Sequence, residues 1–386
     1  MKTRLYILAG GGSGGHLYPG LAVAEEIIRQ TPDAKIVFAC SERSIDRQIL
    51  TDTPYAIAPL PIRPASARPL KALGFGVRMA QSMWRARRML TRLQPSAVLG
   101  LGGFASVPVT WWAARMGFRT AILNPDAVAG KANGLLARRV ERVFTQFECT
   151  WADLPKRARE HVQLVGCPIR RGLAEGQRDL AIKHFGLLKT RKTLLVFGAS
   201  LGAASINAAM AELIGDLDEL AARWQVLLIT GRNKTGSISN TPPRHKGIRV
   251  RTLEYCDRMD LAYAAADLAV CRAGASTVAE LAATATPAVV MPYPHHGDDH
   301  QRRNAEALAE AGGAAICTDS GDTQINAGVL RAVLLPIMQD NARVEAMSAA
   351  AGSLGHPDAA LQVAQWLYRQ APFSAALLRR RDAAAS

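Results

Sequence analysis

The most constraining feature of this chain is a local pattern that occurs in both halves: a short apolar run, a glycine-rich turn and then a helix-length segment. Residues 5–9 run into the glycines that begin at Gly10, and residues 17–28 carry apolar side chains at helical spacing. Residues 193–197 run into another glycine turn, and a helix is expected from about Ser205. Strands that alternate with helices predict parallel sheets with right-handed crossovers. The repeat therefore predicts an α/β chain of two doubly wound, Rossmann-like halves.

The rest of the chain follows the same alternation. Further strands are expected at residues 35–40, 97–101, 119–123, 225–229, 268–271 and 288–292, and helices at 278–283, 301–311 and 359–369. A length of 386 residues exceeds one ordinary hydrophobic core, which favours two domains. We place them at residues 1–165 and 166–345, with a hinge at 165–170. Residues 346–386 are expected to form a C-terminal helical segment with a frayed tail, and its packing back on the first domain is left open.

The charge balance favours anionic partners. The chain has 47 Lys and Arg against 32 Asp and Glu, a formal net charge of +15, and such a field attracts anions. Nucleic acid is not expected, because aromatic residues make up only 6% and no basic stretch is interleaved with them. The six cysteines form no C-x-x-C pair, which favours a reducing cytosol. Neither secretion nor membrane insertion is expected, since no signal peptide or spanning apolar run is evident.

Three glycine turns that follow predicted strands are candidates for phosphate binding. They cover residues 10–15, 101–108 and 197–207. Glycine lets the backbone approach a phosphate closely, and the free N–H groups of a following helix point at negative charge. Ligands bind outside the carboxyl ends of parallel strands, so the first two turns are expected side by side. The alternative for each is a tight turn that holds no ligand.

Side chains near these turns suggest contacts with a sugar nucleotide. Arg170 could give a bidentate guanidinium contact to phosphate oxygens, or be an ordinary surface cation. Glu280 lies early in a predicted helix, where a carboxylate can accept two vicinal ribose hydroxyls or simply complement the helix dipole. His300 and Gln301 begin the next helix and suit sugar hydroxyls. A metal site formed by His295, His296, Asp298, Asp299 and His300 is the minority interpretation of that segment.

With these motifs in order, the chain resembles the glycosyltransferases of the MurG type over nearly its whole length. Members of that family carry G-G-T-G-G-H, G-G-Y-x-S-x-P, G-N-P-V-R, G-G-S-Q-G, S-G-A-x-T-x-x-E and D-x-Q-x-x-N-A segments. The corresponding segments here are residues 11–16, 102–108, 166–170, 198–202, 273–280 and 299–305. Six motifs in the same order are hard to reach by chance.

The resemblance implies the GT-B fold, in which two Rossmann-like domains face a cleft. It also implies inverting transfer of N-acetylglucosamine from its UDP conjugate to the muramoyl 4-hydroxyl of undecaprenyl-pyrophosphoryl-muramoyl-pentapeptide. The first domain would bind this lipid-linked acceptor at the cytoplasmic face of the plasma membrane, and the second would bind the UDP-sugar. The product would be lipid II for peptidoglycan synthesis. No cofactor is implied, and a metal requirement is left open.

The resemblance assigns roles to individual residues. For the donor it implies Arg170, Ser200 and Gly202 at the phosphates, Glu280 at the ribose, His300 and Gln301 at the sugar, and Asp126 in the same pocket. For the acceptor it implies Ser13, Gly14, Gly15, His16, Gly103 and Phe104. His16 is also the candidate general base, because neutral imidazole can take the proton of the attacking hydroxyl at cytosolic pH. Helix capping is the alternative role of His16.

The chain also departs from the family pattern. Asp126 stands where an asparagine is expected, Cys167 replaces an asparagine, Leu201 a glutamine, Phe104 a tyrosine and Val107 a glycine. These changes remove polar groups or add bulk beside predicted substrates. A paralogue with another sugar donor or lipid acceptor, or one that has lost turnover, therefore stays open.

A dinucleotide-dependent oxidoreductase is the alternative from a different class. It would use the first glycine turn, with Glu42 as its ribose-binding carboxylate. The repetition of glycine-bearing units in both halves favours the glycosyltransferase, because a dehydrogenase needs only one nucleotide turn and a distinct catalytic domain.

The segment between residues 70 and 93 is a candidate membrane-docking helix. Leu70, Leu73, Val77, Ala80 and Trp84 form one apolar stripe, and Lys71, Arg78, Arg85 and Arg92 form a basic stripe beside it. Such a helix suits an anionic leaflet, where each nearby Lys or Arg contributes about 1 kcal/mol. The commoner alternative is a helix packed on its own domain with a solvated basic face.

Overall fold

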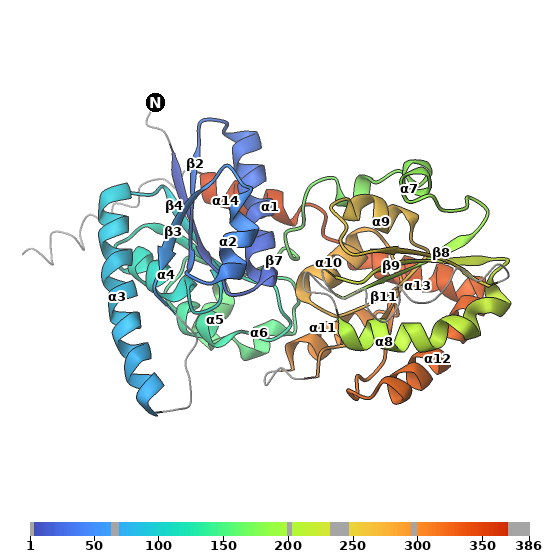
Figure 1. The fold of residues 1–386 in the computed structure, drawn as a ribbon. Coiled ribbons are helices and arrows are strands. Elements are labelled where there is room, and N and C mark those ends of the chain that lie inside the picture. The colour runs from blue at the N-terminus through green and yellow to red at the C-terminus, as the bar shows by residue number, and fades with distance from the viewer. Residues whose placement is uncertain (1–3, 63–68, 199–202, 232–246, 295–298, 370–386) are drawn as a thin grey trace, which may run out of the picture. The chain divides into compact units, whose positions relative to one another are not determined.

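The computed structural model describes residues 4–62, 69–198, 203–231, 247–294 and 299–369, with side chains omitted for residues 69–73. Its contacts divide the chain into two compact units. The N-terminal unit contains the chain up to Pro125, Ala129–Pro168, and the chain from Asp358 onward. The C-terminal unit contains Asp126–Val128 and Ile169–Pro357. Each unit is built around its own parallel sheet (Figure 1).

The sheet of the N-terminal unit has seven parallel strands in the order β3-β2-β1-β4-β5-β6-β7. The strands are β1 Leu5–Gly10, β2 Lys35–Ser41, β3 Ala56–Leu60, β4 Ala97–Gly102, β5 Arg119–Asn124, β6 Arg142–Thr145 and β7 Val162–Leu164. The chain order reverses between β1 and β4, which lie side by side. Binding sites of open parallel sheets form at such a switch point.

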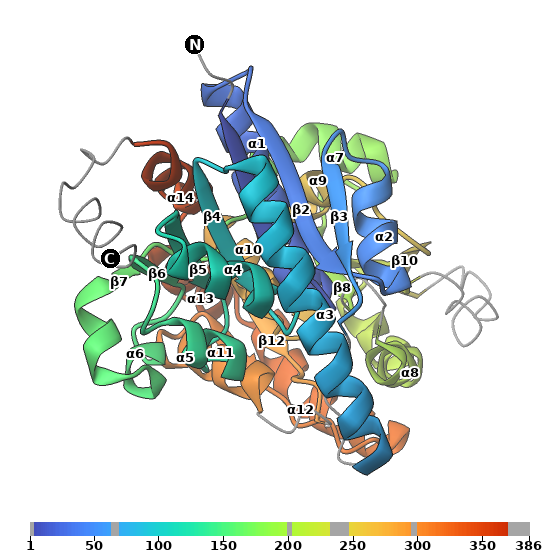
Figure 2. The same ribbon diagram turned by 90° about the vertical axis from the view of Figure 1, so that its left-hand side faces the viewer.

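Helices cover both faces of this sheet. They are α1 Gly14–Gln30, α2 Ser44–Thr51, α3 Pro69–Leu93, α4 Ser106–Arg115, α5 Lys131–Leu136, α6 Thr150–Asp153, the short 3-10 helix η1 Lys156–His161, and α14 Ala359–Tyr368. Alternate residues of β1 point to opposite faces: Tyr6 and Leu8 pack with α1 and α14, whereas Ile7 and Ala9 pack with α3 and α4. Figure 2 shows α3 and α4 across the near face. Burial on both faces explains the nearly continuous apolar strands of the sequence.

The sheet of the C-terminal unit has six parallel strands in the order β10-β9-β8-β11-β12-β13. The strands are β8 Lys192–Phe197, β9 Trp224–Ile229, β10 Arg249–Leu253, β11 Leu268–Cys271, β12 Ala288–Val290 and β13 Ala314–Ile316. Its helices are η2 Leu173–Glu175, α7 Arg178–Phe185, α8 Ala204–Leu213, η3 Ile214–Leu220, α9 Met259–Ala265, α10 Ala275–Ala283, α11 His300–Glu310, α12 Thr323–Gln339 and α13 Asn341–Ser353. Figure 1 shows α7 and α9 on one face and α8 and α12 on the other. The predicted repeat of doubly wound halves is thus confirmed.

The C-terminal helix α14 returns to the N-terminal unit. Val363 and Leu367 are buried in the core that contains α1, whereas Val344 and Met347 of α13 are buried in the core of the C-terminal unit. Arg119 of β5 also places its guanidinium 4.0 Å from the Trp366 ring centroid and donates from Nε to the Trp366 carbonyl at 3.0 Å. The chain therefore changes units at Asp358, after α13, rather than after residue 345 as the sequence analysis placed it.

Candidate active site

The first glycine turn of the N-terminal unit is shorter than the sequence suggests. Gly12 has a φ of +91°, in the region that favours glycine, but Gly14 already begins α1. Ser13 is the N-cap residue, and His16 lies three residues later, in the first turn of the helix. Ser13, Gly14 and Gly15 therefore form the first turn of α1, where backbone N–H groups have no partner within the helix. Such a turn is suited to an anionic group.

Asp46 of α2 holds this glycine turn in place. Its buried carboxylate accepts hydrogen bonds from the Gly12 N–H at 2.7 Å, from the Ser41 N–H at 3.1 Å and from the Ser41 hydroxyl. Arg43 donates from Nη1 to the Gly12 carbonyl at 2.8 Å. Asp46 was not predicted as a site residue, although an acidic residue in the first turn of α2 is a visible signal. Glu42, the ribose ligand of the oxidoreductase alternative, instead places its Oε1 atom 4.0 Å from Nη1 of Arg85.

The second glycine turn lies against the first, as its position after a neighbouring strand predicts. Gly103 has a φ of +71°, and a Cβ there would lie 2.6 Å from the Gly11 carbonyl oxygen and 3.3 Å from Cδ2 of His16. The half-buried His16 ring therefore packs on the backbone of the second turn. Phe104 is 38% exposed and meets Phe75 of α3 edge to face, with ring centroids 6.1 Å apart. Every residue predicted on the acceptor side thus lies in these two adjoining turns.

In the C-terminal unit, Glu280 and Arg170 are brought into electrostatic contact. Burial raises the pKa of the Glu280 carboxyl, while a hydrogen bond from Tyr263 and the charge of Arg170 act in the opposite direction. The Tyr263 hydroxyl donates to Oε2 of Glu280 at 2.8 Å. Burial, and then the charge of Glu280, raise the pKa of Tyr263 well above its ordinary value. The site therefore joins a carboxylate to a nearby guanidinium, a pairing suited to the hydroxyls and the phosphates of a nucleotide.

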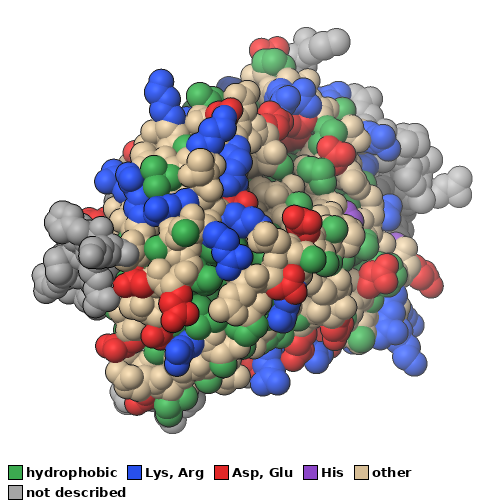
Figure 3. Space-filling view, turned by 90° about the vertical axis from the view of Figure 1, so that its right-hand side faces the viewer, with side chains coloured by type: hydrophobic (Ala, Val, Ile, Leu, Met, Phe, Trp, Pro, Cys, Tyr) green, Lys and Arg blue, Asp and Glu red, His purple; other side chains and the backbone are tan. Residues whose placement is uncertain are grey.

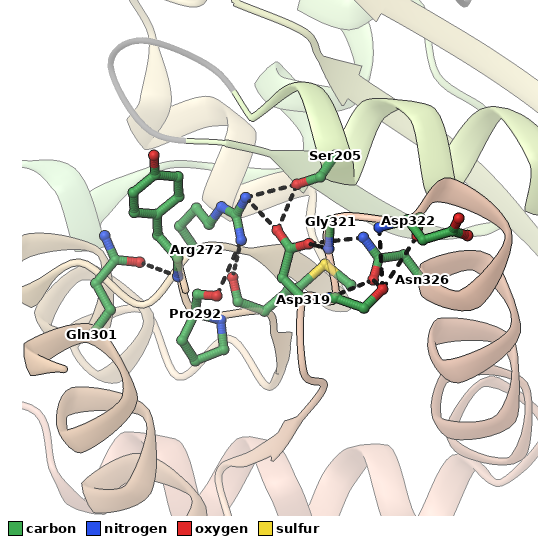
Figure 4. A network of polar contacts seen from close by, with 11 residues as sticks. Ser205, Arg272, Pro292, Gln301, Asp319, Gly321, Asp322 and Asn326 are labelled. Carbon is green, nitrogen blue, oxygen red and sulfur yellow. Dashed lines mark hydrogen bonds and ion pairs between the residues drawn. The ribbon is translucent and has the colours of Figure 1, made fainter. Parts of the chain in front are cut away.

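A buried ion pair holds the ends of several strands of this sheet together (Figure 4). Arg272, which follows β11, donates to the Ser205 hydroxyl at 2.7 Å and to the Asp319 carboxylate at 2.8 Å. Its other terminal nitrogen donates to the carbonyls of Met291 and Pro292, at the end of β12. Neither Arg272 nor Asp319 was predicted as a site residue, because nothing in the sequence pairs residues so far apart in the chain.

The environment of Asp319 fixes it as a carboxylate. Burial raises the pKa of this group, but hydrogen bonds from Ser205, the Gly321 N–H, Arg272 and Asn326 outweigh burial and lower the pKa to about 2. The Asn326 amide donates to Oδ1 at 2.8 Å, and the Gly321 N–H donates to the same oxygen at 2.9 Å. The ion pair thus stays charged throughout the physiological pH range.

Asn304 of α11 links residues 126–128 to the C-terminal unit. Its buried amide donates to the Asp126 carboxylate at 2.9 Å and to the Ala273 carbonyl at 3.2 Å, and its oxygen accepts from the Ala127 N–H at 2.7 Å. Asp126 is therefore hydrogen-bonded to the same unit that carries Glu280. The family motif contains this asparagine, although its motif alone does not predict a role for it.

His300 and Gln301 begin α11, as predicted. His300 is half-buried, and the Gln301 side-chain oxygen accepts a hydrogen bond from the Tyr293 N–H at 2.9 Å. Ser200 and Gly202, and most of the run considered as a metal site, lie outside the described residues. Within the part of the chain that the structure describes, no group of three or more His, Cys, Asp or Glu side chains could hold a metal ion.

The fold and these sites define a class of protein. Two Rossmann-like units, each with glycine turns or polar side chains at the carboxyl ends of parallel strands, form the GT-B architecture of sugar-nucleotide-dependent glycosyltransferases. Residues 6–145 match the glycosyltransferase family 28 N-terminal domain, and residues 193–363 match the glycosyltransferase family 28 C-terminal domain.

Relatives and a solved structure agree with this class. The chain is 36% identical over 365 residues, 93% of this chain and 91% of the relative, to the UDP-N-acetylglucosamine--N-acetylmuramyl-(pentapeptide) pyrophosphoryl-undecaprenol N-acetylglucosamine transferase of Myxococcus xanthus. It is 37% identical to the protein of the same name from Chlorobium limicola, over 93% of this chain and 97% of the relative. The crystal structure of Acinetobacter baumannii MurG matches with a TM-score of 0.73 at 25% identity, covering 95% of this chain and 100% of that one.

The chain therefore belongs to glycosyltransferase family 28. The predicted resemblance, the predicted GT-B fold class and the predicted enzyme class are confirmed, and the oxidoreductase alternative is wrong. All six cysteines are free thiols. No helix in the described ranges combines the length and apolarity that a membrane span requires.

Proposed function

We propose that this glycosyltransferase moves N-acetylglucosamine from UDP-N-acetylglucosamine to the muramoyl 4-hydroxyl of undecaprenyl-pyrophosphoryl-muramoyl-pentapeptide, forming lipid II for peptidoglycan. The observation that carries the proposal is the similarity, along nearly the whole length of both proteins, to relatives whose names state this donor and acceptor. The departures at Phe104, Val107, Cys167 and Leu201 do not break that similarity. The matching experiment incubates the purified enzyme with lipid I and radiolabelled UDP-sugars. Label from UDP-N-acetylglucosamine should enter lipid, whereas label entering only from another donor would refute the proposed donor.

We infer that the C-terminal unit binds the donor. Glu280 would accept the ribose hydroxyls and Arg170 the diphosphate, a division supported by the opposite charges of these neighbouring groups. His300 and Gln301 begin α11 and would bind the sugar hydroxyls, while Asp126, hydrogen-bonded to Asn304 of the same helix, would complete the pocket. Ser200 and Gly202 stay predicted phosphate contacts. Calorimetry with UDP and NAD tests this assignment, because binding of NAD without UDP would contradict it.

We infer that the two glycine turns of the N-terminal unit bind the acceptor. The first turn of α1, Ser13 to Gly15, would hold the acceptor diphosphate, and Gly103 and Phe104 would lie against the sugar or lipid beside it. His16 would take the proton of the 4-hydroxyl as its oxygen attacks the anomeric carbon. The anomeric bond to UDP breaks in the same displacement, so the configuration inverts and the negative charge leaves with UDP.

We further propose that α3 docks the enzyme on an anionic membrane surface, at the cytoplasmic face of the plasma membrane. Trp84 is 62% exposed, Val77 is 53% exposed and Ala80 is exposed, so this part of the apolar stripe faces solvent rather than a core. The buried face of α3 consists instead of Ser82, Ala86 and Leu90. The side chains of Leu70, Lys71 and Leu73 lie outside the described part.

Basic groups accompany this exposed apolar stripe. Arg85, Arg88 and Arg92 are exposed, and the Arg88 guanidinium lies 5.5 Å from the Trp84 ring centroid. A tryptophan combined with arginines suits the headgroup region, where the ring meets acyl chains and the cations meet anionic lipid. The packed-helix alternative does not account for an apolar stripe that points to solvent.

A further inference from the structure

Tyr263 of α9 is a buried tyrosine in contact with the proposed ribose ligand Glu280. It is 2% exposed, and its ring meets Phe197, at the end of β8, edge to face with centroids 5.9 Å apart. Its hydroxyl donates to Oε2 of Glu280 at 2.8 Å. The side chain therefore connects the end of a central strand to the carboxylate proposed to bind ribose.

Glu280 needs such a partner if it is to bind a diol efficiently. A glutamate side chain has three rotatable torsions, and a ligand that must fix all of them loses affinity. Glu280 is the sixth residue of the nine-residue helix α10, beyond the glycine turn at its start. The hydroxyl of a buried tyrosine is a rigid donor, because its ring is held by packing on Phe197.

The direction of this hydrogen bond is fixed by charge. Burial and the neighbouring Glu280 keep the Tyr263 hydroxyl protonated, so it serves as the donor and the carboxylate as the acceptor. Within the described residues, no hydrogen bond to Oε1 of Glu280 is found. Oε1, together with the second lone pair of Oε2, is then available to two vicinal hydroxyls.

We propose that Tyr263 is a positioning residue for donor binding, whose hydroxyl holds the Glu280 carboxylate in the orientation that receives the ribose hydroxyls of the UDP-sugar. This inference rests on the proposed role of Glu280. Tyr263 acts through Glu280 and touches no substrate. A purely structural role, in which the ring only fills the core beside Phe197, is the competing explanation.

Nucleotide binding to the full-length enzyme separates the two explanations. UDP and 2′,3′-dideoxy-UDP are titrated into wild type and Tyr263→Phe, which keeps the ring and removes only the hydroxyl. Loss of a hydrogen bond to a charged group should weaken UDP binding about tenfold. The affinity for the dideoxy nucleotide, which offers no diol, should change by less than about twofold. In turnover, KM for the UDP-sugar should rise while kcat is nearly unchanged. If binding of both nucleotides is weakened equally, or if neither affinity changes, the proposal is overturned.

Two further variants show whether the role of Glu280 or only the role of Tyr263 is refuted. Glu280→Gln should abolish most of the preference for UDP over the dideoxy nucleotide; if it does not, the ribose role of Glu280 fails and the inference fails with it. If Glu280→Gln removes the preference and Tyr263→Phe does not, only the role of Tyr263 is refuted. The double variant Tyr263→Phe/Glu280→Gln should bind like Glu280→Gln alone, whereas additive losses would contradict action through Glu280.

The double variant also keeps the test decisive if Tyr263→Phe folds poorly, because it leaves no half-buried carboxylate without its hydrogen-bond donor. Tyr6→Phe is the matched control, since Tyr6 is buried to a similar degree in β1 of the N-terminal unit. Its affinities for both nucleotides should equal those of wild type.

Discussion

Single carboxylates fix the backbone around both proposed sites. Asp46 binds the N–H of Gly12 and so sets the path of the first glycine turn, while Asp319 binds Arg272 and Ser205 and so sets the loops of the second sheet. Neither is assigned a contact with substrate. Their shared property is that one buried acceptor satisfies several donors from distant segments, which stabilises one loop arrangement over others.

His16 is the residue whose removal should separate binding from chemistry. His16→Ala should lower kcat by about 10² to 10⁴, the usual contribution of a general base, and leave UDP affinity unchanged. The measurement pairs turnover of lipid I with UDP calorimetry. His161→Ala, an exposed histidine of the same unit, is the control and should be fully active. Full activity of His16→Ala would exclude His16 as the base.

Asp319 should make a pH-dependent contribution to stability. Its folded-state pKa of about 2 lies below the ordinary value of 3.8, so its stabilisation is present above the ordinary value and is lost as the pH falls through about 2. Asp319→Asn leaves the Arg272 cation buried without its partner and should cost about 3 to 5 kcal/mol at neutral pH. Denaturant unfolding of the C-terminal unit measures this loss, which should shrink as the pH is lowered below about 4.

The control for Asp319→Asn is a surface ion pair of the same unit. Asp216 lies 3.2 Å from Arg331, and both side chains are largely exposed. Asp216→Asn should therefore cost less than about 1 kcal/mol. Equal losses of unfolding free energy in the two variants would show that burial does not determine how much the Arg272–Asp319 pair stabilises the protein.

At the scale of elements, the sequence correctly predicts that α3 is an amphipathic helix. It does not predict which face of α3 packs on the unit. The sequence displays an apolar stripe through Val77 and Trp84, but the face packed in the unit carries Ser82, Ala86 and Leu90. Ser82 and Ala86 are small, which lets α3 approach its neighbour α4 closely, and Leu90 is buried one turn further along the same face. Val77 and Trp84 are therefore left exposed, outside the core of the unit.

Membrane docking by α3 should depend on both kinds of side chain. Trp84→Ser should weaken binding to anionic liposomes, and Arg85→Ala should weaken it by about 1 kcal/mol, or roughly fivefold, with a smaller effect at high salt. Co-sedimentation with vesicles measures both. Leu180→Ser, at a position 54% exposed on α7, is the matched control and should bind as wild type. Wild-type binding that is absent or insensitive to salt would argue against an electrostatic docking helix.

At the scale of the whole molecule, the chain forms two units, each with its own hydrophobic core. The last described helix, α14, belongs to the N-terminal unit. On the face drawn in Figure 3, Lys and Arg side chains intermingle with Asp and Glu. The positive excess of +15 is therefore not gathered there into one single-sign patch.

The return of α14 predicts an uneven response to truncation. Ending the chain after Pro357 removes Val363 and Leu367 from the N-terminal core, and each buried aliphatic side chain contributes about 1.5 to 3 kcal/mol. The unfolding transition of the N-terminal unit should therefore fall by several degrees or disappear, while UDP still stabilises the C-terminal unit. Differential scanning calorimetry with and without UDP measures both. Truncation after Arg369, which keeps α14, is the control and should preserve both transitions.

The sequence by itself determined the strands, the glycine turns and the order of the motifs, because these depend on local spacing and on backbone geometry that glycine permits. Strands β3 and β13, which lie at the edges of their sheets, were not predicted. Only the tertiary structure decided which stripe of α3 is buried, where α14 packs, and that Tyr263 and Arg272 meet Glu280 and Asp319. Those outcomes depend on contacts between residues far apart in the chain, which packing selects and local sequence does not encode.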